Sequence, residues 1–218
     1  GPAEGSDFLV ETRPEGLHYD FEVGGMSVAP YVQSDIELAE ALTLGIGLRA
    51  EYTRYEYDNR MLDGNTRDDG TPCGFGGCLF TRPADRSDSF FNVAPKASLN
   101  YRLAPATSLY AVAARGFRAP QMTELYRLQS GQQVADLDSE RIDSVELGLR
   151  HDSGELAVDV AAFAMRKRGS VFRDAQGFNV NGARTRHDGI EAALDVRLAP
   201  AWSLAVNATY ARHRYDFD

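Results

Sequence analysis

Arginine and aromatic side chains are concentrated in two long polar segments of this 218-residue chain, residues 58–88 and 118–140. A guanidinium group pairs with carboxylate or catecholate oxygens in a planar fork, and aromatic side chains stack on rings. Together these residue types suit the capture of an anionic metal chelate. Any one of them could instead be an ordinary solvated loop residue. The candidate ligand-binding residues are Arg60, Phe75, Phe80, Arg82, Tyr126, Arg127 and Gln129.

Both cysteines of the chain, Cys73 and Cys78, lie in the first polar segment beside the glycine-rich run 74–77. No third metal ligand lies nearby, so the spacing favours a local disulfide in an oxidising compartment over a metal site or two free thiols. Redox catalysis is disfavoured because four residues separate the cysteines and no helix is expected after them.

The sequence contains no arrangement that predicts catalysis. Its four histidines are scattered along the chain, and a metal-ligand role for His18 with Asp20, or for His187 with Asp188, is less favoured than a surface role. The glycine-rich run 74–77 precedes no predicted helix, so it does not predict a phosphate-binding loop. We therefore expect no catalytic residue, no metal site and no cofactor.

Composition excludes several classes of protein. The net charge of −9 argues against a nucleic-acid partner, because phosphate binding requires clustered lysine and arginine. No run of about 18 apolar residues exists, so no transmembrane helix is predicted. A transmembrane barrel stays open as an interpretation, because its strands alternate apolar and polar residues and have only mild hydropathy. No basic start followed by an apolar core marks a signal peptide at Gly1.

Alternation with a period of two dominates the chain and predicts long strands. The clearest case is 42–57, where Leu42, Leu44, Ile46 and Leu48 alternate with threonine, glycine and arginine. Pro30 and Pro95 fall inside such runs, and each should mark a bulge or a position above a membrane. About eight strands are predicted, at 26–38, 42–57, 89–103, 108–117, 141–151, 155–172, 184–198 and 202–215.

The connections between these strands alternate in length. Short turns are expected at 39–41, 104–107, 152–154 and 199–201, and long loops at 58–88, 118–140 and 173–183. Short turns at one rim and long loops at the other are typical of outer-membrane barrels. The strands of about 11–18 residues are also longer than the usual strand of a soluble sheet.

The stretch from Leu109 to Arg150 carries several motifs in a fixed order: a strand ending in GFRAP at 116–120, then ELY at 124–126, then E-x-G-x-R at 146–150. This pattern resembles the barrel of TonB-dependent outer-membrane receptors. The resemblance implies structural rather than ligand-binding roles for Gly116, Phe117, Arg118, Pro120, Glu124, Glu146 and Gly148.

The resemblance implies an all-β, antiparallel up-and-down transmembrane β-barrel, of which residues 1–218 would form an incomplete arc of about eight strands out of twenty-two. The plug domain and the C-terminal strands would be absent from this chain. It further implies a bacterial outer-membrane receptor for TonB-dependent uptake, with a ferric siderophore as the commonest cargo and haem, cobalamin and glycans as other cargoes. The expected partners are that ligand, the TonB complex through the missing plug, and outer-membrane lipid.

Two other interpretations remain open at this point. One is a small, complete eight-stranded barrel with a structural or adhesive role, in which strand 26–38 would pair with strand 202–215. The other is a soluble β-sandwich, which would require shorter strands and a less regular alternation of loop lengths.

Overall fold

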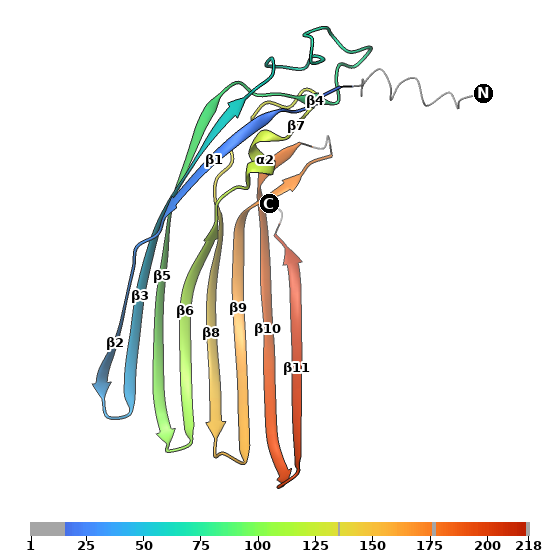
Figure 1. Cartoon of the computed structure of the whole chain (residues 1–218). Helices are drawn as coiled ribbons and strands as arrows, with labels where there is room; N and C mark the ends of the chain where they lie inside the picture. The colour runs from blue at the N-terminus through green and yellow to red at the C-terminus, as the bar shows by residue number, and fades with distance from the viewer. Residues whose placement is uncertain (1–15, 135, 176–177, 217–218) are drawn as a thin grey trace, which may run out of the picture.

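A computed structural model describes residues 16–134, 136–175 and 178–216, and shows one large curved antiparallel sheet (Figure 1). The sheet explains the alternation of the sequence, since each long strand presents one side-chain set to each face. The elements in chain order are β1 (Phe21–Val28), β2 (Tyr31–Ala39), β3 (Leu42–Asn59), β4 (Phe80–Thr81), β5 (Arg86–Ala104), β6 (Thr107–Arg118), α2 (Met122–Tyr126), β7 (Leu128–Gln129), β8 (Glu140–Asp152), β9 (Leu156–Arg173), β10 (Asn179–Ala199) and β11 (Trp202–Tyr215).

The strands follow one another around the sheet in the order β1-β3-β5-β6-β8-β9-β10-β11, and β2 also pairs with β3. The predicted strand 26–38 is therefore wrong as one continuous strand, because it breaks at Ala29 and Pro30 into β1 and β2. Proline has no backbone N–H to donate to a ladder. Since β1 and β2 lie along the two halves of β3, they share one position, and the arc has the predicted eight positions.

The sheet does not close on itself. Within the described residues, β11 pairs only with β10, and neither β1 nor β2 pairs with β11. A closed eight-stranded barrel would join these edges, and a β-sandwich would need a second packed sheet. The structure instead confirms an all-β, antiparallel, incomplete arc.

The two faces of the arc differ in chemistry. On the face defined here as the apolar face, apolar side chains lie opposite one another across neighbouring strands, as Tyr52 does with Phe91 and Leu109 with Leu149. Residues such as Arg49, Glu51, Arg150 and Asp159 lie on the other side, defined here as the polar face. Arg150 pairs with Asp159 there at 2.7 Å. No helix in the described part of the chain is long and apolar enough to cross a membrane.

Pro95 marks a split in the sheet. The ladder between β5 and β6 ends at the pair Lys96 and Ala114, next to the proline, whereas β3 stays paired with β5 as far as Arg86. The pairing of β6 with β8 likewise continues to Arg118. The upper parts of β5 and β6 therefore separate, and Figure 1 shows the two strands diverging toward the loops.

Short turns lie at one end of the strands and the longer connections at the other (Figure 1). The predicted long loops are more ordered than the sequence indicates, because β4 pairs with β7 and α2 forms a short helix between β6 and β7. A small core closes this end, made of Tyr57, Leu125, Tyr126 and Leu137. This core fixes the loops that form the candidate site.

Candidate functional site

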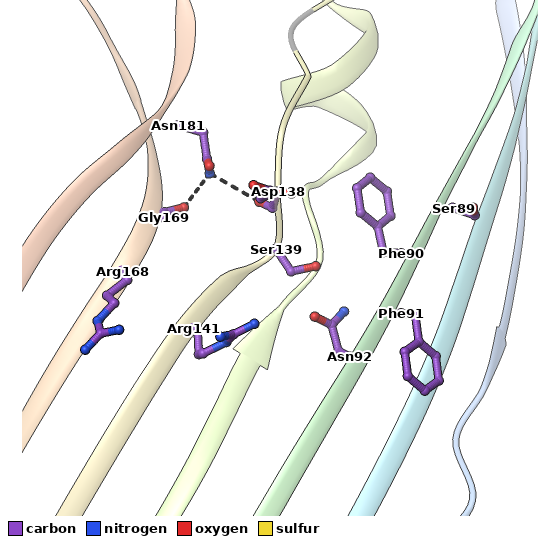
Figure 2. Close-up of a pocket in the computed structure, with 10 residues that line it drawn as sticks. All are labelled: Ser89, Phe90, Phe91, Asn92, Asp138, Ser139, Arg141, Arg168, Gly169 and Asn181. Carbon is purple, nitrogen blue, oxygen red and sulfur yellow. Dashed lines mark hydrogen bonds between the residues drawn. The ribbon is translucent and has the colours of Figure 1, made fainter.

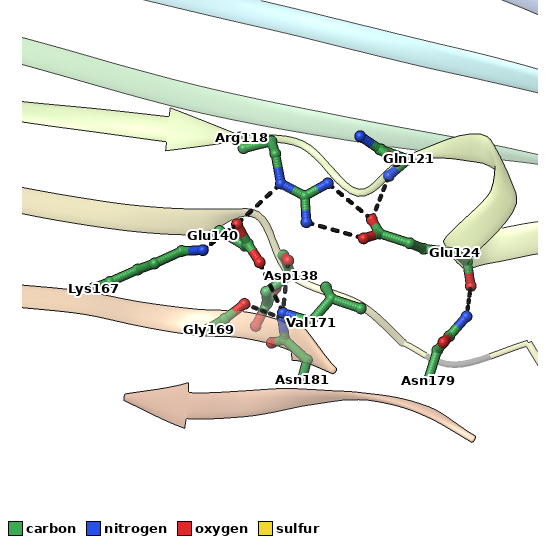
Figure 3. Close-up of polar contacts among 10 residues, drawn as sticks. All are labelled: Arg118, Gln121, Glu124, Asp138, Glu140, Lys167, Gly169, Val171, Asn179 and Asn181. Carbon is green, nitrogen blue, oxygen red and sulfur yellow. Dashed lines mark hydrogen bonds and ion pairs between the residues drawn. The ribbon is translucent and has the colours of Figure 1, made fainter. Parts of the chain in front are cut away.

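Arg118 is the centre of an ion-pair network at the upper end of the polar face (Figure 3). Its Nε donates to Glu140 Oε2 at 2.9 Å, and its two terminal nitrogens donate to the carboxylate of Glu124 at 3.0 and 3.1 Å. Lys167 Nζ on β9 adds a contact of 2.9 Å to Glu140. The network therefore ties the end of β6 to α2, β8 and β9.

Glu140 is ionised because its partners outweigh its burial. Burial alone would raise the pKa of its carboxyl, but hydrogen bonds from Arg118, Lys167 and the backbone N–H of Val171 lower it to about 2. The Val171 N–H lies 2.9 Å from Glu140 Oε1. Each carboxylate oxygen of this buried side chain thus has a charged or amide donor, which is the condition under which a buried charge is tolerated.

Glu124 also fixes the start of α2. Its carboxylate accepts a hydrogen bond of 2.7 Å from the backbone N–H of Gln121, which is one half of a capping box. The backbone carbonyl of Glu124 accepts a hydrogen bond of 2.8 Å from Asn179 Nδ2, at the start of β10. The short helix is therefore held by side chains from three elements rather than by its own length.

Tyr126 packs into the floor of the site instead of facing a ligand. Its side chain is fully buried, its ring stacks on Tyr57 at 4.6 Å, and its hydroxyl donates to Asp88 at 2.8 Å. Burial and the hydrogen bond to Asp88 raise the pKa of Tyr126. The structure therefore corrects the ligand-binding role expected for Tyr126 and places it across the split between β5 and β6.

Arg82 is also a structural residue. Only 3% of it is exposed, and its guanidinium donates to the carbonyl of Leu62 at 2.6 Å and to Thr66 Oγ1 at 2.8 Å. These bonds hold the first long loop together, so the expected ligand contact is corrected here too. The same loop contains the disulfide between Cys73 and Cys78, whose Cα atoms lie 5.1 Å apart.

Three of the candidate ligand residues line one pocket above this floor. The pocket has a volume of about 690 Å³ and includes Phe80, Arg127 and Gln129 together with Phe172 and Arg173. The β4–β7 pairing places Phe80 opposite Gln129, although 49 positions separate them in the chain. Cationic, amide and aromatic groups therefore converge at the loop end of the polar face.

Tyr19 supports this pocket from behind. The Arg127 guanidinium lies 5.9 Å from the centre of the Tyr19 ring, which also packs against Phe80 at 5.1 Å. The Tyr19 hydroxyl donates to the carbonyl of Leu128 at 2.7 Å, and burial raises its pKa to about 12. Tyr19 is a residue that sequence patterns missed, because nothing in its local sequence indicates contact with residues over 100 positions away.

Arg60 and Phe75 do not line this pocket. The Arg60 guanidinium forms an ion pair with Glu22 beside the end of β3. Phe75 is 92% exposed within the disulfide loop. The seven candidate ligand residues thus divide into three that converge, two that support the loops and two that lie apart.

The other motif residues have packing roles. A Cβ atom on Gly148 would lie 2.3 Å from the ring of Tyr110, and one on Gly116 would lie 3.0 Å from Ile142. Only glycine leaves room for the Tyr110 ring at position 148. Glu146 lies opposite Val112 in the ladder between β6 and β8, and Pro120 is fully buried. Phe117 lies opposite Arg141 in the ladder between β6 and β8.

No group of three or more histidine, cysteine, aspartate or glutamate side chains in the described ranges could hold a metal ion. His187 and His213 do meet on β10 and β11, with their Nδ1 atoms 2.6 Å apart, and Thr185 Oγ1 lies 2.8 Å from His187 Nε2. The arrangement is a hydrogen-bonded pair on the polar face.

Comparison with known proteins agrees with this architecture. The family described as TonB dependent receptor-like, beta-barrel matches residues 8–218. Similar solved structures include the ferric yersiniabactin uptake receptor FyuA of Yersinia pestis, with 17% identity, TM-score 0.68, and coverage of 90% of this chain and 28% of that one. The ferric-catecholate import receptor Fiu of E. coli K12 gives 19% identity, TM-score 0.69, and coverage of 91% and 29%.

The copper transporter OprC is also similar, at 16% identity and TM-score 0.66, with 88% of this chain and 30% of that chain covered. At these identities the structural likeness shows the fold, and the chain spans less than a third of the length of each of these structures. The match over residues 8–218, together with the long-stranded arc and the Arg118 network, leads to one conclusion: the chain belongs to the TonB-dependent receptor-like β-barrel family.

Proposed function

We propose that this chain forms part of the barrel wall of a bacterial outer-membrane receptor that takes up a ferric siderophore with energy supplied through TonB. The observation that carries the proposal is the pocket lined by Phe80, Arg127 and Gln129. It lies at the end of the strands where the long loops gather, and it combines a cation with aromatic surface. An anionic chelate offers oxygens to the arginine and rings or apolar edges to Phe80.

The two faces of the sheet support the membrane location. The apolar face carries exposed large side chains such as Val145 at 59% and Leu147 at 61%, which are costly in water and suited to hydrocarbon. The polar face would line the barrel interior, where the remaining domain of the receptor, including a plug that contacts TonB, would lie. On this proposal the chain transports its ligand and does not transform it.

The test uses the full-length receptor in detergent, with quenching of its tryptophan fluorescence by ferric tricatecholate, ferric hydroxamate and ferric carboxylate chelates. Removing one charged hydrogen-bonding partner costs about 1.5–3 kcal/mol. Arg127→Gln should therefore weaken binding of the preferred chelate by about tenfold or more. The matched control is Arg60→Gln, which removes the same charge outside the pocket.

Equal affinities for Arg127→Gln and Arg60→Gln would remove this pocket from the proposal. If none of the three chelate classes binds to the folded receptor, a siderophore is rejected as the cargo. Uptake of the radioactive iron chelate by cells with and without TonB then tests the energy source.

A further inference from the structure

His187 and His213 meet on the polar face, on the neighbouring strands β10 and β11 (Figure 1). They lie directly opposite each other in the ladder, and their Nδ1 atoms are 2.6 Å apart. A hydrogen bond between two ring nitrogens needs one donor and one acceptor, so one of these nitrogens carries no proton. An unprotonated imidazole nitrogen is the commonest metal ligand among protein side chains.

Thr185 positions the ring of His187. Its Oγ1 lies 2.8 Å from Nε2 of His187 on the same strand. A proton on Nε2 that is donated to this hydroxyl leaves Nδ1 as the bare nitrogen, and Nδ1 faces His213. In metal sites the second ring nitrogen of a ligating histidine has such a partner, which fixes the tautomer and the orientation of the ring. The contact with Thr185 therefore has the form of a metal-site support.

A thioether joins the two imidazoles from a third strand. Met165 on β9 lies directly opposite His187 in the ladder between β9 and β10. Side chains that are directly opposite share one face of a sheet, and their Cβ atoms are about 4.5–5.5 Å apart. Three rotatable bonds let the methionine sulfur reach the space beside the imidazoles. The group therefore offers two nitrogens and one sulfur from three neighbouring strands.

Little movement is needed to seat an ion between these ligands. Metal–nitrogen bonds of about 2.0 Å at a tetrahedral angle place two ligand nitrogens about 3.3 Å apart. The Nδ1 atoms of His187 and His213 therefore need to part by less than about 1 Å, which rotation of the side chains provides. His213 is exposed, whereas His187 and Met165 are half-buried, so an ion can reach the group from the polar face.

The charges around this group favour a soft ion of low charge. In the described part of the chain no acidic side chain completes a ligand set with the two histidines. Asp188 lies on the opposite face, where it pairs with Arg212 and Arg214. On the same face as the histidines, Lys167 pairs with Glu140 on the neighbouring strand β8. Uncharged ligands beside a lysine disfavour a doubly charged ion, and a thioether selects Cu⁺ among the ions that imidazole binds.

The pocket in the split between β5 and β6 lacks this donor set (Figure 2). It is lined by Arg141 and Arg168 with a single carboxylate, that of Asp138. A guanidinium group has no free lone pair to give to a metal, and carboxylate oxygen suits hard ions. The two cysteines of the chain are joined in a disulfide, so they do not supply thiolates. The imidazole–thioether group is therefore better suited to a soft ion than either of these places.

We propose that His187, His213 and Met165 form a binding site for one copper(I) ion. The ligand atoms are the two Nδ1 atoms and the methionine sulfur, and Thr185 positions His187. The ion takes the place of the proton between the two imidazoles. That proton moves from Nδ1 to Nε2 of His213, so both Nδ1 lone pairs are free for the ion and the charge of the pair is unchanged. The site belongs to the barrel wall and does not rest on the identity of the cargo.

The test uses the full-length receptor in detergent, without oxygen and with ascorbate as reductant. Cu⁺ is titrated in competition with bathocuproine disulfonate, whose absorbance reports the copper that the receptor does not hold. A hydrogen-bonding partner of a metal ligand is worth about 10–100-fold in affinity, so Thr185→Val should weaken Cu⁺ binding by about tenfold or more. Loss of a ligand in His213→Ala should weaken it by at least about 100-fold.

Two further variants make the test specific. Met165→Leu conserves the volume of the side chain and should weaken Cu⁺ binding while the receptor stays folded, as its gel mobility before heating shows. X-ray absorption at the copper edge should find one sulfur and two nitrogens around the ion, and the sulfur should be lost in Met165→Leu. The matched control is His151→Ala, because His151 contacts Thr107 at the short-turn end of the sheet and should not affect copper.

Unchanged Cu⁺ affinity in His213→Ala would overturn the proposal. An equal loss in His151→Ala would also overturn it, because scattered histidines would then bind the metal. A copper absorption spectrum that is the same in Met165→Leu would exclude the thioether as a ligand and with it the copper(I) site. Binding of the ferric chelates is measured in the same variants and should not change, so failure of this site and failure of the proposed cargo are separate results.

Discussion

Arg118 and Glu124 are six positions apart and form a two-pronged ion pair, with nitrogen–oxygen distances of 3.0 and 3.1 Å. The pair turns the chain back on itself immediately after β6 and sets α2 against the polar face. Because Glu124 also caps α2, one carboxylate serves both the turn and the helix. The loop above is therefore held in place by the protein's own side chains, and on the proposed function this order would lower the entropic cost of binding a ligand.

Replacing Arg118 should loosen this loop. Arg118→Gln leaves the buried part of Glu124 without its charged partner, and we expect local opening to become easier by about 1–3 kcal/mol. Amide hydrogen exchange of Glu124 and Leu125, which both donate to the carbonyl of Gln121, reports the opening. Arg60→Gln removes an exposed ion pair and should leave this exchange unchanged; equal effects of the two variants would contradict the role given to Arg118.

The stability of the same loop should depend on pH through Glu140. Its folded pKa of about 2 lies below its ordinary value of 4.5, so its contribution is complete above pH 4.5 and is lost as the pH falls through 2. This shift in pKa corresponds to roughly 3 kcal/mol of stability. Hydrogen exchange between pH 6 and 2 should show this loss, and Glu140→Gln should remove it. If hydrogen exchange depends on pH in the same way in Glu140→Gln as in the unchanged protein, other groups control the acid response.

Gly148→Ala should destabilise the barrel wall, because the new Cβ would lie 2.3 Å from the ring of Tyr110. Overpacking of this kind costs about 1–3 kcal/mol. The temperature at which the full-length receptor loses its heat-modifiable gel mobility measures the effect. Gly47→Ala is the control, since its nearest contact would be an ordinary 3.7 Å. Adding Tyr110→Ala to Gly148→Ala should relieve part of the strain.

The variant Tyr126→Phe tests whether Tyr126 stabilises the loop structure or contacts the ligand. The variant keeps the stack on Tyr57 and loses the 2.8 Å hydrogen bond to Asp88, which should cost about 0.5–1.5 kcal/mol of stability. Affinity for the ferric chelate should stay within about twofold, because the hydroxyl is buried beneath the pocket. A tenfold weaker affinity with unchanged stability would restore Tyr126 as a ligand contact.

Leu147→Arg tests the orientation of the sheet in the bilayer. Leu147 is 61% exposed on the apolar face, and an arginine facing the bilayer centre costs about 2–4 kcal/mol. Ser144→Arg, on the polar face of the same strand, should cost much less. Folding yield of the full-length receptor into phosphatidylcholine vesicles, measured by gel mobility, should therefore fall for Leu147→Arg alone; equal yields would place Leu147 outside the hydrocarbon.

Sequence alone determined the strands, because a period of two is a local property that each strand carries in its own residues. It predicted β11 at 202–215 without error and β6 and β8 to within about one residue at each end. The expectation of structural roles for Arg118 and Glu124 came from a motif of nearly contiguous positions. The sequence alone did not show that the strand at 26–38 breaks, although Pro30 indicated where a break would fall.

Only the tertiary structure decided the site, because its contacts join residues far apart in the chain. Phe80 meets Gln129 through the β4–β7 pairing, and Arg82 and Tyr126 turn out to be buried. No local pattern distinguishes a loop arginine that binds a ligand from one that holds its own loop. The cross-strand ion pair between Arg150 and Asp159 likewise appears only in the folded sheet, since register depends on cross-strand pairing and not on the order of residues within a strand.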